Sequence, residues 1–320
     1  MNESLLTNSK YGLPQAASML AERVDHLYVF IIWLSVLLFV GVIFATLYFT
    51  FKYKSKSQDS KATAHITHNS FLEITWSVIP LAIVAVIFYW GFKDYLRLSV
   101  APNDAYEINV SAKQWLWAFE YPQTGVKTVN DVVVPVNRNI KFVMSSEDVI
   151  HSFFAPNFRV KKDVVPNRYT TIWFQPNRVG EFQILCTQYC GDGHSKMIGS
   201  IKVVSEADFE TYLKEGSGAA DKDTPLPELG KKLYTSKTCN TCHTIDGSKL
   251  VGPSWKGLYG SQRKLVGGGT ATADENYIRE SIAQPQAKVV DGFPPVMPTF
   301  AGLLSDRDVN AIIEFIKTLK

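Results

Sequence analysis

The sequence predicts a multidomain protein with an N-terminal two-helix transmembrane hairpin, a central all-β domain and a C-terminal all-α domain. Two long apolar segments, residues 27–51 and 74–92, contain no charged residue. Six short runs rich in β-branched and aromatic residues follow between residues 100 and 204, separated by Pro, Gly and Asn, a pattern typical of β-strands. Beyond residue 227 the apolar residues recur at helical spacing.

The changes in pattern give five predicted regions. They are an external N-terminal segment (1–26), the transmembrane hairpin (27–98), the β domain (99–215), a linker (216–226) and the helical domain (227–320). The linker is rich in Gly, Ser, Ala and Asp and contains Pro225. Because such a coil reaches only about 20 Å, it keeps the last domain at high effective concentration near the β domain.

Composition narrows the class of protein. A chain of 320 residues has room for roughly two or three domains. Its net charge of +3, without a clustered basic face, argues against nucleic acid as a partner. A hydrophobic content of 46% favours a soluble body with a membrane anchor.

The first apolar segment is long enough to cross a bilayer core of roughly 30 Å as a helix. A signal peptide would have a shorter apolar core ending at small residues, whereas this segment ends in aromatic residues that suit a membrane interface. The remaining alternative for the two segments is a buried helix pair in a soluble protein. We interpret them as a retained transmembrane hairpin.

Lysines set the predicted orientation of the hairpin. The loop between the apolar segments carries Lys52, Lys54, Lys56 and Lys61. The positive-inside rule therefore places this loop in the cytoplasm, and both termini and the two folded domains outside. The expected location is a bacterial-type inner membrane, with these domains on the periplasmic side.

Soft metal ligands cluster in residues 186–197. Cys186, Cys190, His194 and Met197 offer two thiols, an imidazole and a thioether, and His151 offers a second imidazole upstream. Cys and Met select copper(I), zinc or iron–sulfur, while imidazole suits copper and zinc. A structural zinc knot or a pair of buried thiols is the alternative interpretation.

A second motif, Cys239-Asn-Thr-Cys242-His243, is the attachment signature for a c-type haem. Met297 is the only methionine beyond His243, and no histidine follows that residue. Met297 is therefore the candidate sixth ligand of the iron, and His/Met coordination raises a haem potential. A zinc site, or a methionine that only packs, would be the alternative.

These two motifs resemble the binuclear copper (CuA) domain of cytochrome c oxidase subunit II and, over residues 227–320, a class I cytochrome c. The resemblance implies a cupredoxin-like sandwich for the β domain. It also implies that Cys186 and Cys190 bridge two copper ions, with His151 and His194 capping one ion each. The implied remaining ligands are Met197 and the backbone carbonyl of Gln188.

Three further roles follow from the same resemblance. Residue 188 is usually Glu, whose side chain helps to hold magnesium against subunit I, so Gln188 makes magnesium a doubtful cofactor here. Glu73 takes the position of a proton-path entry residue, although an interfacial Glu that reaches toward water is an alternative. Trp115 takes the position of the electron-entry Trp; it could instead serve packing, and a fused donor could approach by another face.

The resemblance implies an electron-entry subunit of a respiratory haem-copper oxygen reductase. Electrons would pass from a donor through haem c to CuA and on to the haem centres of subunit I, where oxygen is reduced. Enzyme activity would then belong to a complex with subunit I and other oxidase subunits. The implied donor is an upstream cytochrome c or a quinol–cytochrome c reductase-type complex. The alternatives are the corresponding subunit of a nitric oxide reductase and a membrane-tethered electron carrier.

Overall fold

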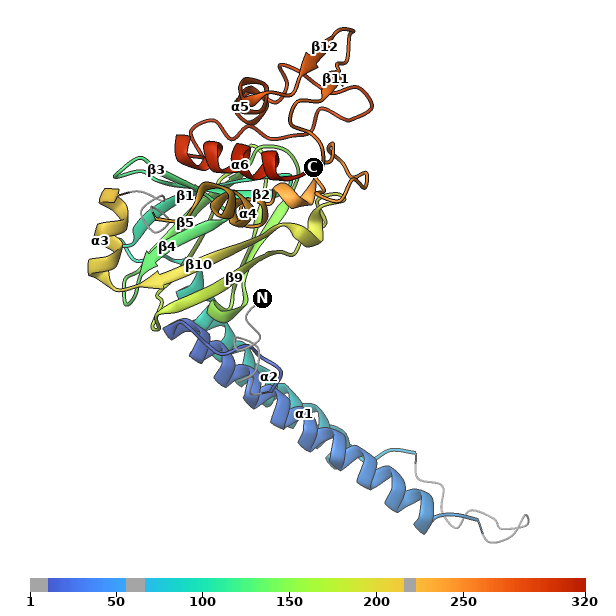
Figure 1. Ribbon diagram of the computed structural model, residues 1–320. Helices are drawn as coiled ribbons and strands as arrows, with labels where there is room; N and C mark the ends of the chain where they lie inside the picture. Colours follow the sequence, from blue (N-terminus) through green and yellow to red (C-terminus); the bar gives the residue numbers. More distant parts are fainter. Residues whose placement is uncertain (1–10, 56–66, 216–222) are drawn as a thin grey trace.

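The computed structural model describes residues 11–55, 67–215 and 223–320. Two long helices, α1 (Met19–Lys52) and α2 (Ser70–Ser99), run side by side away from a β-sandwich, and the C-terminal domain lies at the sandwich's other end (Figure 1). Both helices extend beyond the predicted apolar segments. Lys56, Lys61 and residues 216–222 of the predicted linker lie outside the described residues.

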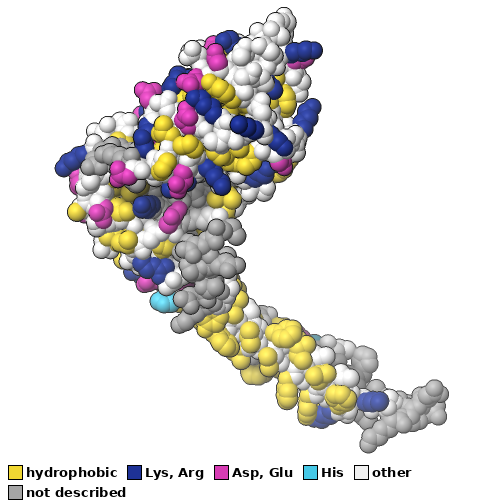
Figure 2. Space-filling model, in the orientation of Figure 1, with side chains coloured by type: hydrophobic (Ala, Val, Ile, Leu, Met, Phe, Trp, Pro, Cys, Tyr) yellow, Lys and Arg dark blue, Asp and Glu magenta, His cyan; other side chains and the backbone are white. Residues whose placement is uncertain are grey.

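The helices α1 and α2 expose their apolar surface. Both are long and apolar enough to cross a membrane, and no part of either apolar stretch is buried within the structure. Figure 2 shows hydrophobic side chains covering the protruding hairpin, while charged side chains gather on the body. This exposure excludes a buried helix pair, because the core helices of a soluble protein would be covered by the rest of the chain.

Polar contacts join the hairpin to the sandwich. Arg159 pairs with Asp25 of α1 through two contacts, of 2.8 and 3.0 Å. Ser18 caps α1 by accepting a hydrogen bond from the backbone N–H of Ala21. Trp173 donates its indole N–H to the carbonyl of Arg97 in α2. The helices therefore leave the sandwich in a fixed direction.

The central domain consists of two five-stranded sheets packed face to face, in agreement with the all-β prediction. The first sheet has the order β3-β2-β1-β5-β8 and the second the order β4-β10-β9-β6-β7. The strands are β1 (Tyr106–Lys113), β2 (Leu116–Tyr121), β3 (Val126–Val129), β4 (Asp131–Pro135), β5 (Ile140–Ser146), β6 (His151–Ala155), β7 (Val160–Val164), β8 (Thr170–Phe174), β9 (Gly180–Cys186) and β10 (Ile198–Val204). An aromatic core that includes Phe142, Phe153 and Phe174 fills the space between the sheets.

The C-terminal region is helical, as predicted. Helix α3 (Glu206–Glu215) ends the β domain, and α4 (Leu226–Ser236), α5 (Glu275–Ala283) and α6 (Asp306–Thr318) form the last domain with a short hairpin of β11 (Gln262–Lys264) and β12 (Thr270–Thr272). Helix α6 begins with a capping box formed by Ser305 and Asp308. The sequence pattern did not predict α5 or the hairpin.

Helices α4 and α6 cross closely at Gly230. A Cβ atom there would clash with the carbonyl oxygen of Ala311 and lie 2.6 Å from Cβ of Phe315. Glycine is required because only hydrogen can occupy the space between the two helix backbones.

We expect Gly230→Ala to separate α4 from α6 and to destabilise the C-terminal domain by about 1–3 kcal/mol, the usual cost of overpacking. Denaturant unfolding of the two chains would measure the difference. Lys231→Ala, at an exposed position of the same helix, is the matched control and should unfold like the parent. Equal stability of Gly230→Ala and the parent would contradict this account of the crossing.

Candidate metal centre

The predicted soft ligands meet at one end of the second sheet. His151 begins β6 and Cys186 ends β9, and these strands are antiparallel neighbours in which Phe153 lies opposite Cys186. The loop after Cys186 returns Cys190, His194 and Met197 to the same place. The two cysteine sulfurs lie 3.8 Å apart, and Cys190 Sγ lies 3.5 Å from His194 Nδ1 and 4.0 Å from Met197 Sδ.

The buried imidazole of His151 fits a metal. Its Nε2 lies 2.8 Å from a carboxylate oxygen of Asp148, while its Nδ1 is buried and has no hydrogen-bond partner among the described residues. The possible ligand atoms of His151, Cys186 and Cys190 all lie within 4.8 Å of one another. A buried nitrogen without a partner is costly, whereas a metal ion at this point would satisfy it.

The carbonyl oxygen of Gln188 lies 3.3 Å from Cys186 Sγ, so a backbone oxygen also faces the sulfurs. The Gln188 side chain, by contrast, is exposed. The donor set of sulfur, imidazole and carbonyl is one that suits copper.

The two thiols differ in acidity. Burial raises the pKa of the Cys186 thiol, but neighbouring polar groups, chiefly the His151 imidazole, outweigh it and bring the pKa to about 6. Burial, together with the neighbouring Cys186 thiolate, raises the pKa of Cys190 to about 12. Burial lowers the pKa of His151, but the bond to Asp148 and the nearby Cys186 thiolate outweigh this and leave the pKa raised. The metal-free site therefore holds protons that a metal must displace.

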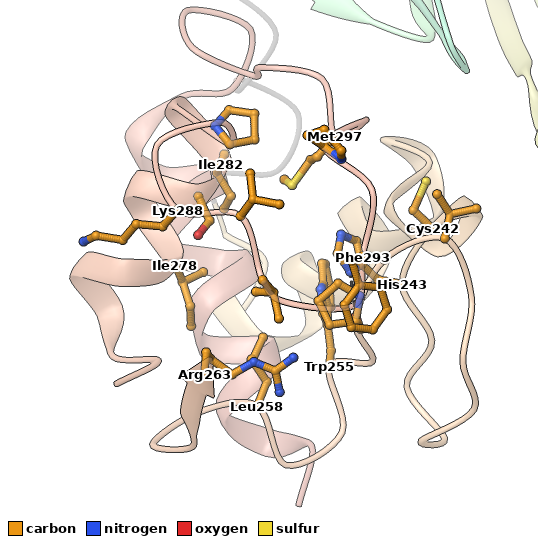
Figure 3. A pocket seen from close by; sticks show the side chains of 18 of the residues that line it. Cys242, His243, Trp255, Leu258, Arg263, Ile278, Ile282, Lys288, Phe293 and Met297 are labelled. Carbon is orange, nitrogen blue, oxygen red and sulfur yellow. Dashed lines mark hydrogen bonds between the residues drawn. The ribbon is translucent and has the colours of Figure 1, made fainter. Parts of the chain in front are cut away.

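The second motif lies beside a pocket in the C-terminal domain. Its lining, mainly apolar, includes Cys242, His243 and Met297, and Figure 3 shows the Met297 sulfur directed into it. Cys239 begins a single 3-10 turn (η5, Cys239–Thr241), Cys242 follows that turn, and both cysteines line a smaller adjoining pocket. This apolar lining suits a flat apolar macrocycle.

Neighbouring groups orient the His243 ring. Its Nδ1 lies 2.7 Å from the carbonyl oxygen of Pro253, which leaves Nε2 as the nitrogen available to iron. Trp255 stacks on the ring at 5.5 Å, and a Cβ at Gly252 would lie 2.7 Å from it. Burial lowers the pKa of His243, which favours the neutral imidazole that coordinates a metal.

Trp115 lies between the two candidate sites. Its indole N–H donates to the carbonyl oxygen of Cys190 at 3.0 Å, and the side chain of Gln114 donates to the same oxygen at 2.8 Å. Gly193 lies so close beneath the indole that a Cβ there would overlap its ring. Trp115 also lines the smaller pocket with Cys239, Cys242 and Met297.

Glu73 lies far from these sites along the sequence, in the first turn of α2. Its carboxylate accepts a hydrogen bond from the backbone N–H of Asn69 at 3.2 Å, and the Asn69 side chain accepts one from Leu72 N–H. The side chain is exposed. Glu73 thus contributes locally to the start of the helix, whatever else it does.

Sequence reasoning missed three supporting residues. Asp148 precedes His151 by three residues, a spacing that could have marked it as the partner of the imidazole. Gln114 adjoins Trp115 but gives no local signal of its bond to Cys190. Trp255 lies beyond the haem motif, and only the tertiary fold brings it over His243.

Three family models match the chain. Residues 6–93 match the transmembrane domain of cytochrome c oxidase subunit II, residues 124–204 its periplasmic domain, and residues 227–320 cytochrome c.

Relatives include cytochrome c oxidase subunit 2 of Alkalihalophilus pseudofirmus, 27% identical over 84% of this chain and 79% of that protein. The Bacillus subtilis protein of the same name is 26% identical over 83% of this chain and 80% of its own length. Among solved structures, the periplasmic domain of subunit II of cytochrome oxidase of Bradyrhizobium japonicum is 30% identical. It covers 37% of this chain and 96% of its own, with a TM-score of 0.36.

We expect copper binding to the metal-free chain to tighten as pH rises from 6 to 8. The raised pKa values of Cys190 and His151 mean that copper must displace protons, which are held less firmly at higher pH. The affinity should rise about tenfold per pH unit for each proton displaced. Titration in buffers of different ionisation enthalpy would count the released protons, and a pH-independent affinity would contradict this prediction.

Proposed function

The chain belongs to the cytochrome c oxidase subunit II family, extended by a cytochrome c domain, and we propose that it is the electron-entry subunit of a respiratory haem-copper oxygen reductase. In this proposal electrons pass from a donor through haem c to CuA and on to the haem centres of subunit I. The family implies copper and the cytochrome c domain implies haem. When bound, copper and haem each accept and release one electron at a time.

The proposed ligands are groups that lie together in the fold. Copper would be held by Cys186 and Cys190, by Nδ1 of His151 and His194, by Met197 and by the carbonyl of Gln188. In the C-terminal domain Cys239 and Cys242 would attach the haem covalently, and His243 and Met297 would bind its iron. The exposed Gln188 side chain offers magnesium only a neutral amide oxygen where the family usually has a carboxylate.

One observation carries the proposal. Trp115 borders the pocket beside the haem motif on one side and donates a hydrogen bond to the Cys190 carbonyl on the other. A single aromatic side chain therefore spans the two candidate centres. This supports Trp115 as the electron-entry residue, and the donor that reaches it is the fused domain.

The proposed orientation places both folded domains on the periplasmic side. Lys52 ends α1 and Lys54 follows it, at the end of the hairpin farthest from the sandwich, which supports a cytoplasmic loop there. The exposed apolar faces of α1 and α2 are available to lipid and to the polytopic subunit I. An upstream cytochrome c or a quinol–cytochrome c reductase-type complex would supply the electrons.

Purification of the complex through this chain tests the proposal. We expect a polytopic haem subunit to co-purify, about two copper ions per covalently bound haem in this chain, and oxygen consumption with a reduced donor. Consumption of nitric oxide in place of oxygen would favour the related reductase. Isolation of the chain without a haem partner would favour a tethered carrier, and zinc in place of copper would overturn the proposal.

Glu73→Gln separates a proton-path role from helix capping. Glutamine can still accept the hydrogen bond from Asn69 N–H, so α2 should begin normally, but it cannot carry a proton. We therefore expect slower oxygen turnover by the complex with unchanged copper and haem spectra. Leu72→Ala, a neighbouring exposed change, is the control, and wild-type turnover of Glu73→Gln would remove the proton-entry role.

A further inference from the structure

The β-sandwich, which carries the candidate copper site and is called the copper domain below, contributes side chains to the core of the C-terminal cytochrome domain (residues 227–320). Leu116 of β2 and Val129 at the end of β3 are almost fully buried, and both belong to the apolar cluster built from α4, α5 and α6. Leu116 also lines the smaller pocket beside Cys239 and Cys242. The two domains therefore share an apolar contact next to the haem motif.

Lys237, which follows α4, crosses this contact. Its ammonium group donates to the carbonyl oxygen of Val129 at 3.0 Å and pairs with the carboxylate of Asp131 at 2.8 Å. The lysine side chain is 13% exposed, although the Asp131 side chain is 43% exposed. A lysine buried to this extent is held by specific partners, because leaving the charge unpaired would be costly.

Asn130 makes a second crossing from the copper domain. Its side-chain oxygen accepts a hydrogen bond from the backbone N–H of Trp117, which fixes the side chain within its own domain. Its amide nitrogen lies 3.3 Å from the Thr238 hydroxyl and 3.4 Å from the Ser236 carbonyl oxygen. The residue has a φ of 63°, a left-handed conformation that Asn tolerates better than most residues.

Both crossings join residues next to the two candidate centres. On one side, Thr238 directly precedes Cys239, and Tyr234 of α4 donates to the carbonyl of His243 at 2.6 Å. On the other side, Trp117 packs edge-on against His151 at a ring distance of 6.2 Å. If these contacts shifted, the residues around the haem motif would move relative to the residues around the copper site.

We propose that Lys237 and Asn130 are positioning residues that latch the cytochrome domain onto the copper domain in the orientation that sets its pocket against Trp115. This inference rests on the electron relay proposed above. The linker keeps the domains at high effective concentration but does not select an orientation. The latch does so, because its charged and amide groups find their partners in one arrangement only.

Lys237→Met tests the latch, because it keeps the length of the side chain and removes the charge. After rapid photoreduction of the haem in the intact complex, we expect transfer to copper to slow about tenfold, since methionine leaves the Val129 carbonyl and the Asp131 carboxylate without their partner across the contact. The haem and copper spectra should not change. Lys237→Arg should restore much of the rate, and Lys231→Met, at an exposed position of α4, should leave it unaltered.

Two measurements keep the test decisive if Lys237→Met folds poorly. Asp131→Asn alters the other domain and should slow the same transfer, with a combined effect of the two changes smaller than the product of the single effects. Hydrogen exchange of the segment 126–131 should quicken in both variants, a readout that requires no metal.

Wild-type transfer in Lys237→Met would overturn the latch and leave the relay standing. If the haem and copper of the parent exchange no electrons, the relay itself fails. A slow rate accompanied by altered haem or copper spectra would also overturn the latch, because the change would then act on the centres themselves.

Discussion

The pairing of β6 with β9 is the constraint on which the candidate copper site depends. It places Phe153 opposite Cys186, so that His151 at the start of one strand comes close to the cysteine at the end of the other. The aromatic core beneath, with Phe153 between Phe142 and Trp117, makes a slip of the register expensive because every inward side chain would turn outward. A rigid sandwich therefore holds ligands that are far apart in the sequence.

The two candidate centres use burial in opposite ways. At the copper site, polar neighbours lower the pKa of Cys186 despite its burial and so favour the thiolate. Close to it lie the carboxylate of Asp148 and the imidazole of His151, whose pKa is raised. In the cytochrome domain, burial acts on His243 with only the Pro253 carbonyl as partner and keeps the ring neutral. Cys186 and His243 are thus favoured in the protonation state that binds a metal, whereas Cys190 and His151 must first lose protons.

The sequence predicted the three-part fold and the candidate ligand side chains that the structure brings together, because soft ligands at short spacing are informative without tertiary knowledge. It predicted six of the ten sandwich strands and missed β2, β3, β6 and β7. The contacts between the two domains could not be predicted from the sequence. In the sequence alone, Asn130 looks like an ordinary turn residue and Lys237 like an ordinary surface lysine. Their partners lie more than a hundred residues away in sequence.

The docked cytochrome domain also limits where an external donor can bind. Trp115 lies against the pocket beside Cys239 and Cys242, and Leu116 beside it is buried in the cytochrome domain's core. A second protein cannot occupy a face that the fused domain already covers. In the proposed relay, an external donor would therefore meet the cytochrome domain rather than the copper domain at Trp115, and its binding surface should be sought on residues 227–320.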